Sequence, residues 1–79
     1  MRCFITGVAG FLGSHLADGA LDRGWKVLGV DNFFRGRREH LPEHDEFTFQ
    51  ELDLCDDITE LSSLLTSFTP DVILHYGAI

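Results

Sequence analysis

Three glycines at intervals of three residues lie in the run Thr6-Gly7-Val8-Ala9-Gly10-Phe11-Leu12-Gly13. The residues just before the run, 3–6, are apolar or β-branched and predict a buried strand. From Leu12 onward, apolar side chains recur on one helical face, and Gly24 is placed to end that helix. The run therefore predicts a tight turn that joins a strand to a helix.

Three further strands are predicted after this helix. Residues 25–30 form an apolar segment that ends at Asp31, and residues 32–46 predict a loop with one helical turn. Residues 47–50 alternate between aromatic and polar side chains, as in a strand with one better-buried face. Residues 72–75 are again apolar and predict the fourth strand.

A second helix is predicted between the third and fourth strands. Asp57 followed by Glu60 resembles a capping box, with Asp57 as the N-cap, and Pro70 ends the helix. The residues expected on its buried face are Ile58, Leu61, Leu65 and Phe68.

Strands that alternate with helices predict an α/β fold with a parallel sheet and right-handed crossovers. The expected architecture is part of a doubly wound sheet with strand order 3-2-1-4. The fourth strand would lie at an edge although its side chains are those of an interior strand. We therefore expect the chain to be truncated after strand 4, with an exposed edge that can pair with another chain.

The glycine run has the features of a pyrophosphate site. Gly7 permits the tight turn, and Gly10 lacks the Cβ that would hold the backbone away from phosphates. Gly13 lets the helix pack closely on the sheet. The amides of Phe11 and Leu12 open the helix, where they can point at an anion with the helix dipole behind them.

Asp31 ends the second predicted strand, 18 residues after Gly13. A carboxylate there can accept hydrogen bonds from both hydroxyls of an adenosine ribose, and it would repel a 2′-phosphate. This favours NAD over NADP. Arg35, Arg37 and Arg38 keep NADP open as the less favoured cofactor, because a guanidinium can pair with that phosphate. The simpler alternative is a plain tight turn, with Asp31 and the arginines in solvent.

Length and charge narrow the possible partners. The chain has 79 residues, 44% of them hydrophobic and 24% charged, which is typical of one small globular domain. Its formal net charge is −7, which argues against nucleic acid or an anionic membrane surface as a partner. Residues 1–41 hold six basic and four acidic residues, whereas residues 42–79 hold nine acidic residues and no Lys or Arg. An anionic ligand would therefore meet the N-terminal half.

The chain contains no apolar run long enough for a membrane span and no signal-peptide pattern after Met1. Cys3 and Cys55 are too few for a disulfide scaffold and fall near strands that are not neighbours in the expected sheet. We expect a cytoplasmic protein with small buried thiols, without a redox pair.

Four segments resemble the extended short-chain dehydrogenase/reductase family, and within it the NAD-dependent nucleotide-sugar epimerases and dehydratases, which have a Rossmann fold. The first is the glycine run, and the second is the segment 30–37 after the second strand. The third is the pair Asp53-Leu54, and the fourth is the segment 71–78. The fourth segment departs from the usual His-Leu-Ala-Ala or His-Phe-Ala-Gly ending at Tyr76 and Gly77.

The resemblance implies a dinucleotide site made by four turns. Asp31 and Asn32 would serve the adenosine ribose, with Gly36 nearby, and Asp53-Leu54 would meet the adenine ring. The glycine run would hold the pyrophosphate. Tyr76, Gly77 and Ala78 would line the path to the nicotinamide ribose. The implied cofactor-binding residues are Gly7, Gly10, Phe11, Leu12, Gly13, Asp31, Asn32, Gly36, Asp53, Leu54, Tyr76, Gly77 and Ala78.

Members of this family carry a catalytic Tyr-x-x-x-Lys pair, which this chain lacks. Tyr76 is its one tyrosine and Lys26 its one lysine. We therefore expect residues 1–79 to be the N-terminal NAD(P)-binding portion of a UDP-glucose 4-epimerase-like epimerase, dehydratase or decarboxylase, inactive alone. A nucleotide sugar would bind only in a full-length form. The alternative is a stand-alone NAD-binding or sensing module, oligomeric through its fourth strand. A purely structural domain would leave the glycine spacing and Asp31 unexplained.

The four histidines offer weaker candidates. His40 and His44 have the spacing of a metal pair, but Pro42 between them breaks the helix that would align them. We therefore expect a solvated loop there and not a metal site. His15, in the first helix, could approach a phosphate, although packing or solvent exposure is commoner for such a residue. His75, at a strand end, is expected to be hydrogen-bonded and structural.

Overall fold

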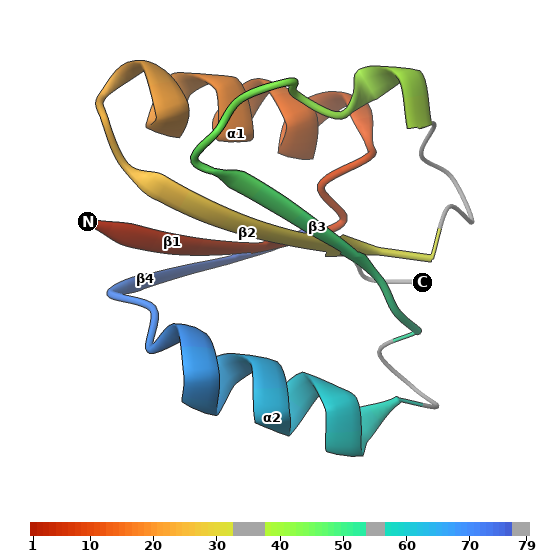
Figure 1. Ribbon diagram of the computed structural model, residues 1–79. Helices are drawn as coiled ribbons and strands as arrows, with labels where there is room; N and C mark the ends of the chain where they lie inside the picture. The colour runs from red at the N-terminus through yellow and green to blue at the C-terminus, as the bar shows by residue number, and fades with distance from the viewer. Residues whose placement is uncertain (33–37, 54–56, 77–79) are drawn as a thin grey trace.

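The computed structural model describes residues 1–32, 38–53 and 57–76 of the chain. The elements, in chain order, are β1 (Arg2–Thr6), α1 (Phe11–Asp22), β2 (Lys26–Asp31), the 3-10 turn η1 (Arg38–His40), β3 (Phe47–Glu51), α2 (Ile58–Phe68) and β4 (Val72–His75) (Figure 1). These elements agree with the strands, helices and single helical turn that the sequence predicts.

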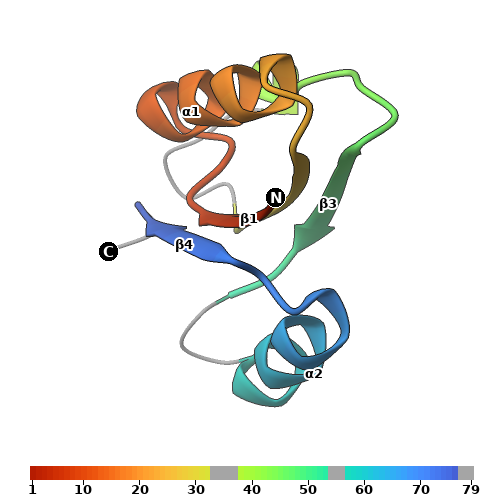
Figure 2. The ribbon, with the colours of Figure 1, turned by 90° about the vertical axis from the view of Figure 1, so that its left-hand side faces the viewer.

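The four strands form one parallel sheet in the order β3-β2-β1-β4, which confirms the predicted order 3-2-1-4. In this sheet Ile5 pairs with Gly29 of β2 on one side and with Leu74 of β4 on the other. Helix α1 covers one face and α2 lies on the opposite face (Figures 1 and 2). The helices lie on opposite faces because the two right-handed crossovers run in opposite directions across the sheet.

The core between α1 and the sheet is closely packed. Small side chains on α1, Ala17 and Ala20, let the helix approach the strands, and Leu16 and Trp25 pack at the margin. The buried members of this first core are Cys3, Ile5, Val8, Ala17, Ala20, Leu21 and Val27. Burial raises the pKa of the Cys3 thiol, because the thiolate would be poorly solvated there. This thiol is therefore neutral at physiological pH.

The second core, under α2, is more open. Its buried members are Phe4, Leu28, Val30 and Leu52. The residues of α2 that pack on them are Leu61, Leu64, Leu65 and Phe68. They follow the i, i+3, i+4, i+7 spacing of one helical face. The prediction for Ile58 is wrong: this residue is 61% exposed, and Leu64 packs on the second core instead.

The start of α2 differs from the predicted capping box. Asp57 is the N-cap residue, as expected, but its side chain makes no capping hydrogen bond. Its carboxylate accepts a hydrogen bond of 2.8 Å from the backbone N–H of Asp53 instead. The Asp57 carboxylate is therefore engaged by the backbone of Asp53, and this contact competes with capping of α2.

Helix α2 ends at Thr69, which has a left-handed backbone with φ 48°. A β-branched residue in this region costs about 1–2 kcal/mol relative to glycine. Replacing Thr69 by glycine removes this cost, but part of the gain in stability is offset because glycine is more flexible in the unfolded chain. We expect Thr69→Gly to raise the free energy of unfolding by about 0.5–1 kcal/mol, measured by urea denaturation.

The matched control for Thr69→Gly is Gly24→Ala. Gly24 follows α1 with φ 81°, and a Cβ there would meet no atom within 4 Å. Any decrease in the free energy of unfolding of Gly24→Ala therefore reports backbone strain alone, and we expect a decrease of about 1 kcal/mol. A stability loss in Thr69→Gly as large as in Gly24→Ala would contradict the prediction.

Candidate cofactor-binding site

The turn after β1 is built around Gly7, whose backbone is left-handed with φ 72°. The Gly7 N–H donates to the carbonyl oxygen of Val30 on β2, at 2.9 Å. The carbonyl oxygen of Gly7 accepts from the N–H of Gly10, at 3.1 Å. These bonds tie the turn to the end of β2 and fold it back on itself, and the positive φ explains why glycine stands at this position.

Gly13 is the position at which α1 comes closest to the turn. A Cβ built there would overlap the carbonyl oxygen of Gly7 and lie 3.0 Å from its carbonyl carbon and 3.1 Å from the Cα of Val8. At Gly10 the same atom would lie 3.3 Å from the Gly7 oxygen, a tight contact that a small shift can relieve. The third glycine of the run is therefore the one that packing requires most strictly.

Gly29 is a further required glycine that the sequence analysis did not single out. It lies in the middle of β2, where a Cβ would come within 2.6–2.8 Å of the side-chain carbons of Val8. Val8 is fully buried and has no space to move into. A glycine inside a predicted strand is the signal that could have indicated this close approach.

The start of α1 presents free backbone amides. The first helical hydrogen bond runs from Ser14 N–H to the Gly10 carbonyl oxygen, at 2.9 Å, so the amides of Phe11 and Leu12 precede it. The side chains of both residues are exposed, and the first turn contains no acidic residue. The positive end of the helix dipole is therefore not offset locally, and this end of α1 can hold an anion.

Asp31 lies against the glycine turn. Its side chain is buried, and its Oδ2 accepts a hydrogen bond from the Ala9 N–H at 2.9 Å. The backbone carbonyl of Asp31 accepts from Leu52 N–H, at 3.0 Å, which joins the ends of β2 and β3. The carboxylate predicted for a ribose therefore also holds the turn, a second role that the sequence pattern did not indicate.

Asn32 and Asp53 come together beyond β2 and β3. The side-chain amide of Asn32 donates to the Asp53 carboxylate at 3.5 Å, a weak hydrogen bond. The Asp57 carboxylate accepts from the backbone N–H of Asp53 and so holds this residue, which is predicted to meet the adenine amino group. Polar side chains predicted for the adenosine half thus meet at one end of the sheet.

The end of β4 is fixed to the end of β1. Tyr76 N–H donates to both the carbonyl oxygen and the Oγ1 of Thr6, each at 3.0 Å. His75 Nδ1 lies 2.7 Å from the same Oγ1, so the expected hydrogen-bonded role of His75 is confirmed. The Tyr76 side chain is exposed beside the carboxyl end of the sheet. Four predicted site residues lie outside the described residues: Gly36, Leu54, Gly77 and Ala78.

The other histidines have separate local partners. His15 Nδ1 lies 3.0 Å from the Phe11 carbonyl oxygen, and its ring packs on the Phe11 ring at a centroid distance of 4.5 Å. His44 Nδ1 accepts from the backbone N–H of Glu46, at 3.0 Å. Across the described parts of the chain, His, Cys, Asp and Glu nowhere gather in a group of three that could hold a metal ion.

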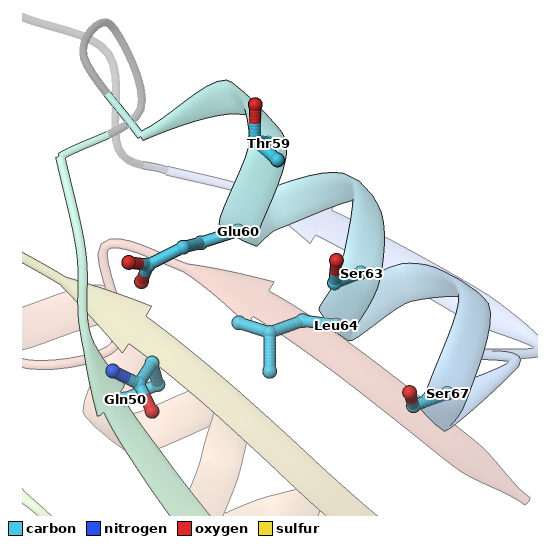
Figure 3. A pocket seen from close by; sticks show the side chains of 6 residues that line it. All are labelled: Gln50, Thr59, Glu60, Ser63, Leu64 and Ser67. Carbon is cyan, nitrogen blue, oxygen red and sulfur yellow. The ribbon is translucent and has the colours of Figure 1, made fainter.

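A groove of about 250 Å³ lies between α2 and β3 (Figure 3). Gln50 faces it from β3, and the Leu64 side chain projects into it from α2. The α2 residues that complete its lining are Thr59, Glu60, Ser63 and Ser67. One carboxylate and several separate hydroxyls do not form a nucleophile–base pair, and none of the predicted site residues lines this groove.

The strand order, the glycine turn and the helix that opens from it together define a Rossmann fold, the doubly wound dinucleotide-binding class. The model of the NAD dependent epimerase/dehydratase family matches residues 3–79, and the chain belongs to this family. Neither α1 nor α2, the two α-helices in the described residues, is long and apolar enough to cross a membrane.

Several characterised proteins are similar to this chain. A UDP-glucose 4-epimerase of Mycolicibacterium smegmatis is 42% identical over 81 residues, which cover 99% of this chain and 25% of that protein. A UDP-N-acetyl-alpha-D-glucosaminuronate decarboxylase of Bacillus cytotoxicus is 39% identical, covering 99% and 24%. The crystal structure of the Bordetella bronchiseptica enzyme WbmH in complex with NAD+ has a TM-score of 0.94 at 44% identity, covering 99% and 26%. The chain thus spans about a quarter of the length of these relatives.

Proposed function

We propose that this chain is the NAD-binding portion of a nucleotide-sugar epimerase, dehydratase or decarboxylase of the UDP-glucose 4-epimerase-like type. One observation carries the proposal: the free amides of Phe11 and Leu12 open α1 beside a buried carboxylate, Asp31, that is bonded to the same turn. The pattern combines an anion site with an acceptor for sugar hydroxyls. The known ligands of similar proteins, NAD+ in WbmH among them, support the assignment.

The turn residues fit the pyrophosphate of a dinucleotide. The main chain at Gly10 has no side chain to keep phosphate oxygens away, and the amides of Phe11 and Leu12 supply donors with the helix dipole behind them. Gly7 and Gly13 keep the turn in this shape. When bound, NAD supplies hydride acceptance and return, while these residues bind it and fix its orientation.

The adenosine half fits the ends of β2 and β3. Asp31 would accept from the ribose hydroxyls with Asn32 beside it, and Asp53 would accept from the adenine amino group, as the family resemblance implies. The Asp31 carboxylate would repel a 2′-phosphate, which favours NAD over NADP. Gly36, near the adenosine ribose, and Leu54, against the adenine ring, are the other residues proposed to contact the adenosine half. Tyr76, with Gly77 and Ala78, would line the path to the nicotinamide ribose.

The catalytic step is assigned to other parts of a full-length protein. The family's Tyr-x-x-x-Lys pair is not present in the 79 residues, whose one lysine, Lys26, precedes the one tyrosine, Tyr76. No catalytic residue is therefore proposed in this chain. Turnover of a nucleotide sugar is proposed only for the full-length form.

The experiment that tests the proposal is calorimetric titration of NAD into the protein as its gene encodes it, with Gly10→Val as the variant. A β-branched side chain at Gly10 would occupy the space in front of the amides, and its Cβ would already lie 3.3 Å from the Gly7 oxygen. We expect NAD affinity to fall by more than about tenfold, equivalent to about 1.4 kcal/mol.

The matched control is Gly19→Val, which makes the same substitution in the same helix. A Cβ at Gly19 would meet no atom within 4 Å, so its NAD affinity should equal that of the wild type. Wild-type protein that fails to bind NAD, or Gly10→Val that binds as tightly as Gly19→Val, would reject the proposal.

The second candidate, a stand-alone NAD-binding or sensing module that oligomerises through β4, finds no support in the comparisons, in which the chain aligns with about a quarter of each relative. Ile73 on β4, an edge strand of the sheet, has a side chain that is 56% exposed. The gene sequence beyond Ile79 separates the two candidates. A downstream Tyr-x-x-x-Lys supports the enzyme portion, whereas a stop codon together with NAD binding by an oligomer supports the module.

A further inference from the structure

Ala9, in the middle of the glycine turn, is held by two side chains from outside the turn. It is fully buried. Its N–H donates to Asp31 Oδ2 at 2.9 Å, and its carbonyl oxygen lies 2.9 Å from His40 Nδ1. Because a carbonyl oxygen can only accept, the Nδ1 atom of His40 carries the proton in this contact. His40 is the candidate donor of a hydrogen bond that shapes the turn.

The peptide group that His40 contacts stands directly before the free amides. It joins Ala9 to Gly10, and on its other edge the Gly10 N–H donates to the Gly7 carbonyl oxygen at 3.1 Å. A peptide group is planar, so fixing both its oxygen and its N–H fixes its orientation. The next amide along the chain is that of Phe11. The His40 contact therefore affects the direction in which the anion-binding amides point.

Asp31 and His40 lie on either side of one segment of chain. Asp31 ends β2, and His40 is the last residue of η1. Both contact Ala9, one at its N–H and one at its carbonyl oxygen. The end of β2 and the end of η1 are thus both attached to the proposed phosphate turn.

We propose that His40 is a positioning residue for pyrophosphate binding: by donating to the Ala9 carbonyl, it holds the Ala9–Gly10 peptide so that the following amides face the phosphates. This inference rests on the proposed NAD-binding function and adds to it a residue outside the glycine run and outside the resemblance. His40 does not touch the ligand in this proposal and acts only through the backbone of the turn.

The test measures the affinities of NAD, ADP and adenosine, the last two by displacement of NAD, in the full-length protein as encoded. His40→Ala should weaken the binding of NAD and ADP about five- to tenfold, which is within the roughly two- to twelvefold loss that corresponds to one neutral hydrogen bond. The affinity for adenosine, which lacks the phosphates, should fall by less than about twofold. His40→Asn should restore most of the affinity, because its side-chain amide can donate in the same region.

The control variant is His44→Ala. His44 is also an exposed histidine, but its ring accepts from the nearby backbone N–H of Glu46, so all three ligand affinities should remain unchanged. The proposal is overturned if His40→Ala binds ADP as the wild type does, if adenosine loses as much affinity as ADP, or if His40→Asn is no better than His40→Ala.

The outcomes also separate this inference from the proposed function. Wild-type protein that binds none of the three ligands rejects NAD binding itself. Wild-type protein that binds NAD, loses it in Gly10→Val and keeps it in His40→Ala rejects only the role of His40. The two hypotheses therefore fail in different measurements.

Discussion

Gly13→Ala is expected to destabilise the protein by about 3 kcal/mol or more, above the range usual for a single added methyl group in a core. The new Cβ would overlap the Gly7 carbonyl oxygen and press on Val8 Cα at 3.1 Å, so backbone atoms rather than flexible side-chain ends must move. Val8 is fully buried, which leaves the turn no free space on that side. Urea denaturation of the variant and the wild type measures the loss.

The control for this prediction is Gly19→Ala in the same helix. It adds the same methyl group where no atom lies within 4 Å, and alanine favours a helix over glycine by about 1 kcal/mol. We therefore expect a gain of about 0.5–1 kcal/mol in Gly19→Ala. The packing interpretation is wrong if the two variants shift the free energy of unfolding in the same direction.

Asp31→Asn is expected to lower NAD affinity by about tenfold and to lower NADP affinity less, so that the preference for NAD over NADP falls. The amide oxygen can still accept from Ala9 N–H, so the turn is kept while the charge is removed. Hydrogen bonds to a charged acceptor contribute about 1.5–3 kcal/mol and neutral ones about 0.5–1.5, which accounts for the NAD loss. NADP should lose less because the repulsion of its 2′-phosphate also disappears.

Asp31→Ala separates the two roles of this side chain. It removes the charge and also leaves the buried Ala9 N–H without its acceptor, which costs about 1–3 kcal/mol of stability. Urea denaturation should thus show a stability loss in Asp31→Ala that Asp31→Asn lacks. Calorimetric titration measures the NAD and NADP affinities of both variants. Asp22→Asn, an exposed change on α1, should affect neither quantity. An unchanged ratio of NAD to NADP affinity in Asp31→Asn would contradict the ribose assignment.

The sheet could be predicted from sequence because its determinants are local. Apolar runs, glycine and proline boundaries and the alternation of strands with helices are visible in the chain, and the crossover rule then restricts the strand order. The turn after β1 was equally visible, since glycine spacing reports where a side chain cannot fit. Family resemblance added the positions at the ends of β2, β3 and β4.

The contacts that the sequence did not reveal depend on how segments of the chain approach one another in space. Ile58 fits the helical period, but α2 crosses the sheet so that Leu64 packs and Ile58 is exposed. Asp57 fits a capping pattern, but a backbone N–H of the preceding turn competes for its carboxylate. His40 was expected in a solvated loop, but its ring contacts the Ala9 carbonyl oxygen, 31 residues earlier in the chain. Each of these contacts depends on which segments come close together in the folded chain, and residue periodicity does not contain that information.

The interlocking of Gly29 with Val8 restricts how this domain can evolve. A larger residue at position 29 collides with Val8, and a smaller residue at position 8 leaves an unfilled void beneath the turn. Each substitution alone is harmful, whereas an exchange of bulk between the two positions preserves the total volume. Divergence at positions 8 and 29 should therefore proceed more readily by paired mutations, and libraries that change one codon at a time should lose stability at each position.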